Sequence, residues 1–253
     1  MKQNQKKKRY EKLDGVRGIA LLHMIAYHMI WDLVYIYQLD WNWYQSKGAY
    51  VWQQGICWTF IFLSGFCWSL GSRARRRGII VFLGGAVITL VTLAVMPQSR
   101  VVFGVLTLIG SCMLLMQVFD RWLQRIPAAV GIAGSFGLFF LTRNINDGWL
   151  GFEDWNIVAL PAGLYRNILM TYLGFTQPGF YSTDYFSLFP WLFLFLAGYF
   201  TYRLLADKKA MQLMEKGALR PVEWLGRHSF EIYMIHQPAI YAILEALHRL
   251  GVF

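Results

Sequence analysis

Charged residues are scarce in this 253-residue sequence: aspartate, glutamate, lysine and arginine make up 15% of it, whereas hydrophobic residues make up 57%. A soluble globular domain contains about 25% charged residues, and a disordered chain is poor in apolar residues. The composition therefore excludes both classes and indicates a polytopic membrane protein.

The motifs of common soluble enzymes are also missing. The sequence has no nucleotide phosphate loop, no GxGxxG fingerprint, no GxSxG elbow and no zinc-binding spacing. The three cysteines, Cys57, Cys67 and Cys112, lie in apolar stretches, where cysteine acts as a small packing residue. No internal repeat or low-complexity linker divides the chain. We therefore expect one integral membrane domain over residues 1–253, with residues 1–12 as a basic cytoplasmic tail and no metal site.

The stretch Val16 to Tyr37 is long enough to cross a bilayer but still carries Arg17, His23, His28 and Asp32. A charge at the bilayer centre costs at least about 2.5 to 3.5 kcal/mol on insertion scales. Ionisable residues in a span therefore usually face a protein interior or a water-filled cavity, and we expect a functional site here.

Helical periodicity places three of these residues on one stripe. At about 100° per residue, Arg17 and His28 lie within about 20° of each other, and Asp32 follows one turn later. With a rise of about 1.5 Å per residue, His28 lies about 16 Å beyond Arg17, near mid-membrane if Arg17 is at the inner surface. His23 points about 140° away from His28, and we expect a core residue that faces a different neighbour.

The other apolar stretches predict an all-α bundle of seven transmembrane helices. The six further spans are about Val51 to Leu70, Gly78 to Met96, Val101 to Phe119, Pro127 to Thr142, Tyr185 to Leu205 and His228 to His248. The apolar segment Ile157 to Phe175 contains Pro161, Gly163 and Arg166, which favour an interfacial or re-entrant helix over a full span.

The basic residues predict the orientation. Of the 24 lysines and arginines, a cytoplasmic N-terminus leaves these few outside: Lys47, Arg100, Arg143, Arg166 and Arg249. The excess of basic over acidic residues is therefore a topology signal and not a nucleic-acid-binding surface. We predict a multi-pass protein of the plasma membrane with its N-terminus in the cytoplasm and its C-terminus outside.

A mid-membrane histidine with an arginine and a carboxylate on the same stripe suits acid–base chemistry. Neutral imidazole is a general base near pH 7, and an arginine near the inner face can bind phosphate. Asp32 could orient His28 or contact an acceptor, and its position in the sequence does not separate these roles. A purely structural polar bridge between helices is the alternative.

The last predicted span supplies a second set of polar residues. Arg227 and His228 lie at its inner end, where they could hold phosphate groups or act as membrane anchors. His236 and Gln237 lie at mid-depth beside Pro238, which frees a backbone carbonyl. We expect His236 to be a site residue, because its depth is nearly that of the histidine in the first span.

Two further features are open to more than one interpretation. Ser64, next to Gly65, either places a hydroxyl near the cavity or only permits close helix packing. The acidic and aromatic residues of Arg143 to Asp184 either form a platform for an acceptor or belong to a solvated loop.

The sequence resembles the transmembrane acyltransferases. The segment LDGVRGIA (residues 13–20), followed by His28, is similar to their opening helix, in which an arginine and a histidine are separated by ten residues. The rest resembles one branch, the bacterial proteins similar to heparan-alpha-glucosaminide N-acetyltransferase, formerly a domain of unknown function. The segments that carry this resemblance are HMIWD (28–32), FIFLSG (60–65), FGVLTLIG (103–110), DYFSLFPW (184–191) and LGRHSFEIYMIHQP (225–238).

The resemblance implies transfer of an acetyl or similar acyl group from cytoplasmic acyl-CoA to a hydroxyl or amine. The acceptor would be an extracytoplasmic molecule that contains sugar or belongs to the cell envelope. His28 matches the catalytic histidine, as general base or acyl carrier, and Arg17 matches its paired arginine. One departure is Thr107, which stands where the family often has a polar histidine or glutamine, and this leaves acceptor choice open.

The expected roles are then as follows. The catalytic residues are His28, Asp32, Arg17 and His236; the residues that bind acyl-CoA are Arg17, Arg227, His228 and Ser64; and those that bind the acceptor are Asp184, Gln237 and Trp191. Acetyl-CoA is the expected donor, the lipid bilayer is a partner, and a homodimer is left open. The alternative is a proton-coupled transporter or exporter that uses His28, Asp32 and His236 as a proton relay.

Overall fold

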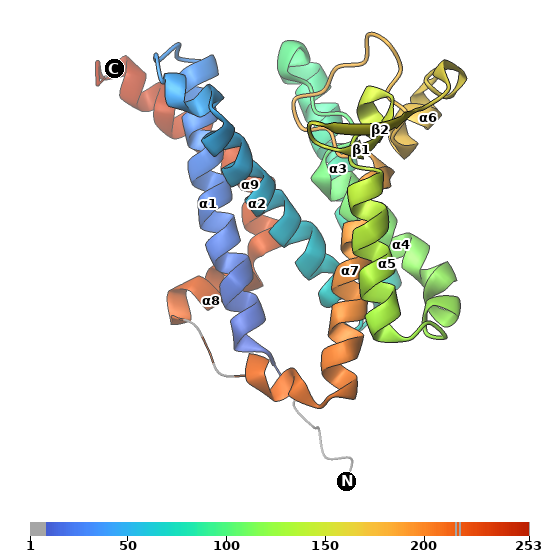
Figure 1. The fold of residues 1–253 in the computed structure, drawn as a ribbon. Helices are drawn as coiled ribbons and strands as arrows, with labels where there is room; N and C mark the ends of the chain where they lie inside the picture. Colours follow the sequence, from blue (N-terminus) through green and yellow to red (C-terminus); the bar gives the residue numbers. More distant parts are fainter. Residues whose placement is uncertain (1–8, 216, 218, 253) are drawn as a thin grey trace. The chain divides into compact units, whose positions relative to one another are not determined.

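The computed structural model of the protein describes residues 9–215, 217 and 219–252. Residues 1–8 of the predicted basic tail therefore lie outside the described residues. Most of the described chain is α-helical (Figure 1). The helices form two compact units: the first comprises the chain up to Phe60 together with the residues from Lys208 onward, and the second comprises Ile61–Asp207.

The first unit is organised around α1 (Glu11–Tyr35), which lies beside α8 (Arg220–Arg227) and α9 (Ser229–Arg249) (Figure 1). It also contains two 3-10 turns, η1 (Asn42–Gln45) and η5 (Ala210–Met214), and most of α2 (Lys47–Phe66). Its buried apolar cluster joins α1 to α2 and to the last two helices through these residues: Leu21, Met24, Ile56, Leu225 and Ile232.

Two glycines bring α1 and α8 into backbone contact. A Cβ atom on Gly226 would lie 1.8 Å from the carbonyl oxygen of Asp14, and one on Gly18 would lie 2.0 Å from the carbonyl oxygen of Val222. No real side chain fits at such distances, so only glycine permits this approach. The start of α1 and the whole of α8 are therefore held against each other.

The second unit pairs α3 (Ala74–Val95) with α4 (Val105–Leu123), and α5 (Ala128–Leu141) with α7 (Leu188–Asp207). Its core contains large side chains that are almost completely buried: Leu108, Phe139, Leu194, Phe195 and Tyr199. Short 3-10 turns lie between the longer elements: η2 (Pro97–Ser99), η3 (Ile145–Asp147) and η4 (Ala162–Leu164).

The helix predicted over Ile157 to Phe175 is wrong. Strands β1 (Trp149–Phe152) and β2 (Trp155–Ala159) form an antiparallel hairpin, and the only α-helix within the predicted range is the six-residue α6 (Ile168–Leu173). The reason is local, because Pro161 and Gly163 interrupt a helix, while β-branched residues at the start of the range favour a strand. The fold is therefore mostly helical and not all-α.

A helix covers most of each of the seven predicted spans: α1, α2, α3, α4, α5, α7 and α9. Within the described residues, four of them are long and apolar enough to cross a membrane: α1, α3, α4 and α7. Helix α5 is apolar but shorter. These apolar helices indicate a membrane protein, while the number of crossings and the orientation stay predictions.

Candidate functional site

Arg17 lies near the start of α1, facing α8. Its guanidinium is 3.3 Å from Oδ1 of Asp14 and donates a hydrogen bond of 3.4 Å to the carbonyl oxygen of Gly226. Asp14 also accepts a hydrogen bond of 3.0 Å from Nε of Arg9. Sequence reasoning missed Asp14, although its i,i+3 spacing from Arg17 is that of side chains that meet on a helix.

The rings of His28 and His236 contact each other across α1 and α9, with centroids 4.9 Å apart in an edge-to-face arrangement. Nδ1 of His236 lies 2.6 Å from the carbonyl oxygen of Tyr233. A carbonyl can only accept, so Nδ1 carries the proton, and Nε2 of the neutral ring is an acceptor. Among the described residues this buried Nε2 has no hydrogen-bond partner.

Asp32, one turn beyond His28, is fully buried. Its Oδ1 accepts a hydrogen bond of 2.6 Å from Nε2 of Gln237 on α9. Within the described part of the chain, the other oxygen of each side chain, Oδ2 of Asp32 and Oε1 of Gln237, is buried without a partner. The structure thus pairs Asp32 with Gln237 and not with His28.

These contacts confirm that Arg17, His28 and Asp32 share one face of α1. That face meets α8 and α9, and three buried acceptor atoms at its contact with α9, one on α1 and two on α9, have no donor among the described residues. Leaving one such group unsatisfied costs about 1 to 3 kcal/mol. Three such acceptors together could receive hydrogen bonds from a molecule that brings O–H or N–H groups.

His23 is not the core residue that we expected. Its side chain is exposed, and its Nδ1 accepts a hydrogen bond of 3.0 Å from Nε1 of Trp52 on α2. It does face a different neighbour from His28, as the 140° rotation predicted.

Arg227 and His228 lie where α8 ends and α9 begins. Arg227 is exposed, and its Nε donates a hydrogen bond of 3.3 Å to the carbonyl oxygen of Glu223. The ring of His228 packs on Trp224, with centroids 4.5 Å apart. Because Gly226 contacts Arg17, both residues belong to the same end of the first unit as Arg17.

Ser64, Trp191 and Asp184, which we also expected to bind substrate, belong to the second unit. Ser64 is half-buried on α2. Trp191 is only 3% exposed, packs against Phe139, and lies 5.0 Å from the guanidinium of Arg143. The ring of Trp191 is therefore part of the core of this unit.

Thr107, the departure from the family pattern, is buried on α4 against α3. A Cβ atom on Gly85 would lie 2.4 Å from Oγ1 of Thr107. The side chain at position 107 therefore lies in a tight helix contact, where a larger histidine or glutamine would need a different arrangement of α3 and α4.

Asp184 caps the start of α4. Its Oδ2 accepts a hydrogen bond of 3.2 Å from the backbone N–H of Val105. Further hydrogen bonds tie the neighbouring segments together, among them that of 2.9 Å from the N–H of Phe186 to the carbonyl oxygen of Phe103. Burial raises the pKa of Asp184 to about 6, and the hydrogen bond from Val105 opposes this rise only in part.

This pKa predicts a pH-dependent stability. Because the folded state holds the proton of Asp184 more tightly than the unfolded state, stability falls as the pH rises from about 4 to about 6 and is constant above that. We expect a contribution of about 2 kcal/mol, reduced from the full shift because the side chain is partly exposed. Thermal unfolding at pH 4 to 8 should show this slope, and Asp184→Asn should remove it. An unchanged slope in that variant would contradict the assignment.

Comparison with protein families gives a match over almost the whole chain. The family model described as heparan-alpha-glucosaminide N-acetyltransferase, catalytic, matches residues 9–238. The match includes every residue of the polar contacts between α1 and α9 described above. Comparison with curated proteins and with solved structures gives no match.

Proposed function

Because the chain belongs to the heparan-alpha-glucosaminide N-acetyltransferase catalytic family, we propose that it is a membrane-embedded acyltransferase that moves an acetyl or similar acyl group from cytoplasmic acyl-CoA to a sugar-containing acceptor. The family is one of acetyltransferases that use acetyl-CoA. The acceptor's hydroxyl or amine reacts at His28 and comes from the opposite side of the membrane. Nothing in the chain identifies that acceptor as heparan.

One observation carries the proposal. Nε2 of His236, Oδ2 of Asp32 and Oε1 of Gln237 are buried acceptors without donors in the described part of the chain. A ligand that donates hydrogen bonds to these atoms must carry several O–H or N–H groups, and a sugar supplies them as hydroxyls and amines. A closed structural bridge between helices would instead satisfy its own polar atoms.

The residues of this site have separate tasks in the reaction. His28 accepts the proton of the attacking hydroxyl or amine as the new bond to the acyl carbon forms. The carbon–sulfur bond breaks, and His28 returns the proton to the leaving thiolate. In the covalent variant, a nitrogen of His28 takes the acyl group as the carbon–sulfur bond breaks, and the proton of the imidazole passes to the leaving thiolate. The acceptor then takes the acyl group from His28, and its proton returns to the ring. His236 supplies a second imidazole that can share the proton.

Two other groups position the reactants. Asp32 and Gln237 accept hydrogen bonds from the acceptor and fix its orientation. At the end of the unit that holds Arg17, three cationic or hydrogen-bonding side chains suit the phosphates of CoA: Arg17, Arg227 and His228. The guanidinium of Arg17 is shared with Asp14, which fixes its direction.

Reconstitution of the full chain in liposomes tests this function. With acetyl-CoA on one side and glucosamine on the other, we expect thiol release and an acetylated product in equal amounts. The controls are protein-free liposomes and an acceptor without a free hydroxyl or amine. Flux that depends on a pH gradient, with no thiol release, would instead establish the transporter that uses His28, Asp32 and His236 as a relay.

A further inference from the structure

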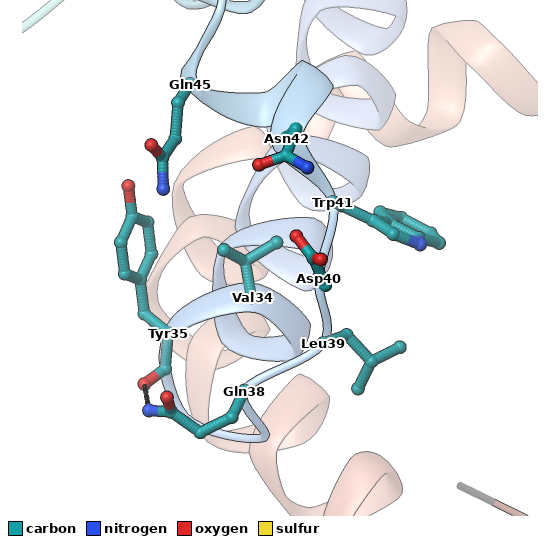
Figure 2. A pocket seen from close by; sticks show the side chains of 8 residues that line it. All are labelled: Val34, Tyr35, Gln38, Leu39, Asp40, Trp41, Asn42 and Gln45. Carbon is teal, nitrogen blue, oxygen red and sulfur yellow. Dashed lines mark hydrogen bonds between the residues drawn. The ribbon is translucent and has the colours of Figure 1, made fainter.

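The end of α1 opposite Arg17 forms a pocket with the segment that follows it (Figure 2). The pocket has a volume of about 350 Å³ and is lined by residues between Val34 and Gln45. This volume is near the lower limit for ligand sites, about 300 to 1,000 Å³, and suits a single ring and not an extended chain.

The wall of the pocket is anchored to α1. Gln38 adopts a left-handed backbone conformation (φ 60°), which reverses the chain after the helix. Tyr44, only 5% exposed, then folds back so that its hydroxyl donates a hydrogen bond of 3.3 Å to the carbonyl oxygen of Tyr27. The rings of Tyr27 and Tyr44 also contact each other at 4.9 Å. The pocket is therefore preformed, and its anchor lies next to His28 in the sequence.

The lining combines amides and a carboxylate with aromatic rings. Figure 2 shows the ring of Tyr35 and the amide of Gln45 on one side, the carboxylate of Asp40 and the amide of Asn42 on the other, and Val34 between them. Amides and carboxylates bind hydroxyl groups, while aromatic and aliphatic side chains pack against apolar ring faces. A sugar ring presents both kinds of surface.

The charged residues that line the pocket restrict the kind of sugar that it can bind. Asp40 is its one acidic residue, and none of the lining residues is a lysine, arginine or histidine. A carboxylate attracts a protonated amine, tolerates a neutral hydroxyl and repels a uronate or sulfate group.

We infer that this pocket binds a neutral or amine-bearing sugar ring of the acceptor and excludes anionic sugars. The inference rests on the proposed function, because it assigns the pocket to the acceptor of that reaction. Val34 lies six residues beyond His28, about 9 Å along the helix axis. The pocket therefore holds the part of the acceptor adjacent to the group that reacts at His28.

A charge reversal tests the inference with the full chain in nanodiscs. Methyl glucosaminide, methyl glucoside and methyl glucuronide serve as acceptors, with acetyl-CoA as donor. For Asp40→Lys we expect the KM of the glucosaminide to rise at least about tenfold and the KM of the glucuronide to fall below it. The KM for acetyl-CoA should not change. A misfolded variant cannot gain this new preference.

A second variant tests the aromatic wall. Tyr35→Leu should raise the KM of the glucosaminide and the glucoside about equally, because it removes a ring contact and no charge. Tyr241→Leu is its matched control, since Tyr35 and Tyr241 are 46% and 44% exposed and only the former lines the pocket. Lys47→Gln is the control for charge, because it lies in the adjoining segment outside the pocket.

Binding of the glucosaminide without acetyl-CoA, measured by saturation-transfer NMR, separates this inference from the proposed function. If transfer occurs but neither binding nor KM responds to Asp40→Lys and Tyr35→Leu, the inference is overturned and the transferase stands. If the glucosaminide binds in a manner that depends on Asp40 while no acceptor is acetylated, the sugar pocket stands and the transferase is overturned.

Discussion

His28→Ala is expected to lower kcat for acetyl transfer by about 10²- to 10⁴-fold, the usual contribution of a positioned general base. The ring of His28 contacts the ring of His236, close to the buried acceptors of α1 and α9 that have no partner among the described residues. Removing it leaves the attacking hydroxyl or amine without a proton acceptor or acyl carrier. The KM for acetyl-CoA should change little, because the groups expected to bind its phosphates are near Arg17. Acceptor-dependent thiol release measures both quantities.

His23→Ala is the matched control for this variant. His23 is on the same helix five positions earlier, but it is exposed and bonded to Trp52. We expect the His23→Ala variant to turn over substrate at close to the wild-type rate. A loss of activity found only in His28→Ala would then not be a general effect of removing an imidazole from α1. A folded His28→Ala protein with wild-type turnover would rule out the proposed mechanism.

Gly226→Ala adds a single methyl group and is expected to lower the free energy of unfolding of the protein strongly. The new Cβ would lie 1.8 Å from the carbonyl oxygen of Asp14, and neither backbone can move without shifting a helix. Overpacking by a side chain costs about 1 to 3 kcal/mol, and a clash between two backbones should exceed that. Thermal unfolding and the monodisperse fraction in size-exclusion chromatography should both show the loss.

Gly55→Ala provides the comparison, because it makes the same change in the first unit without a contact. A Cβ on Gly55 meets nothing within 4 Å. Alanine is a better helix former than glycine by about 0.5 to 1 kcal/mol, so this variant should be unchanged or slightly more stable. Equal melting temperatures for the two variants would contradict the backbone contact between α1 and α8.

The sequence was sufficient for the seven long helices, which follow from the length of the apolar stretches, and for the polar face of α1, which follows from helical periodicity. It could not provide the hydrogen bond from Gln237 to Asp32 or the tautomer of His236. These depend on how α9 is placed and rotated against α1, which no single stretch encodes. The pairing of Asp14 with Arg17, in contrast, is a local i,i+3 contact and could have been predicted.

The wrong prediction for Ile157 to Phe175 and the expected role of Trp191 have a common physical origin. Apolar content alone suggested a helix over Ile157 to Phe175, although β-branched residues, Pro161 and Gly163 pointed to a strand and a loop. Trp191 shows a related difficulty, since an aromatic residue that packs in a core and one that stacks on a sugar look alike in a sequence. Only burial, at 3% exposure, separates them.

A Cβ atom on Gly226 would lie 1.8 Å from the carbonyl oxygen of Asp14 and 3.0 Å from the backbone nitrogen of Gly18, so this glycine contact also bears on how α8 is aligned along α1. The interval from Gly18 to His28 equals the interval from Gly226 to His236. The first interval lies within the single helix α1, whereas the second crosses the junction at His228 between α8 and α9. A slip of α8 along α1 at the glycine contact would therefore be passed through this junction to α9, and it would separate the ring of His236 from that of His28.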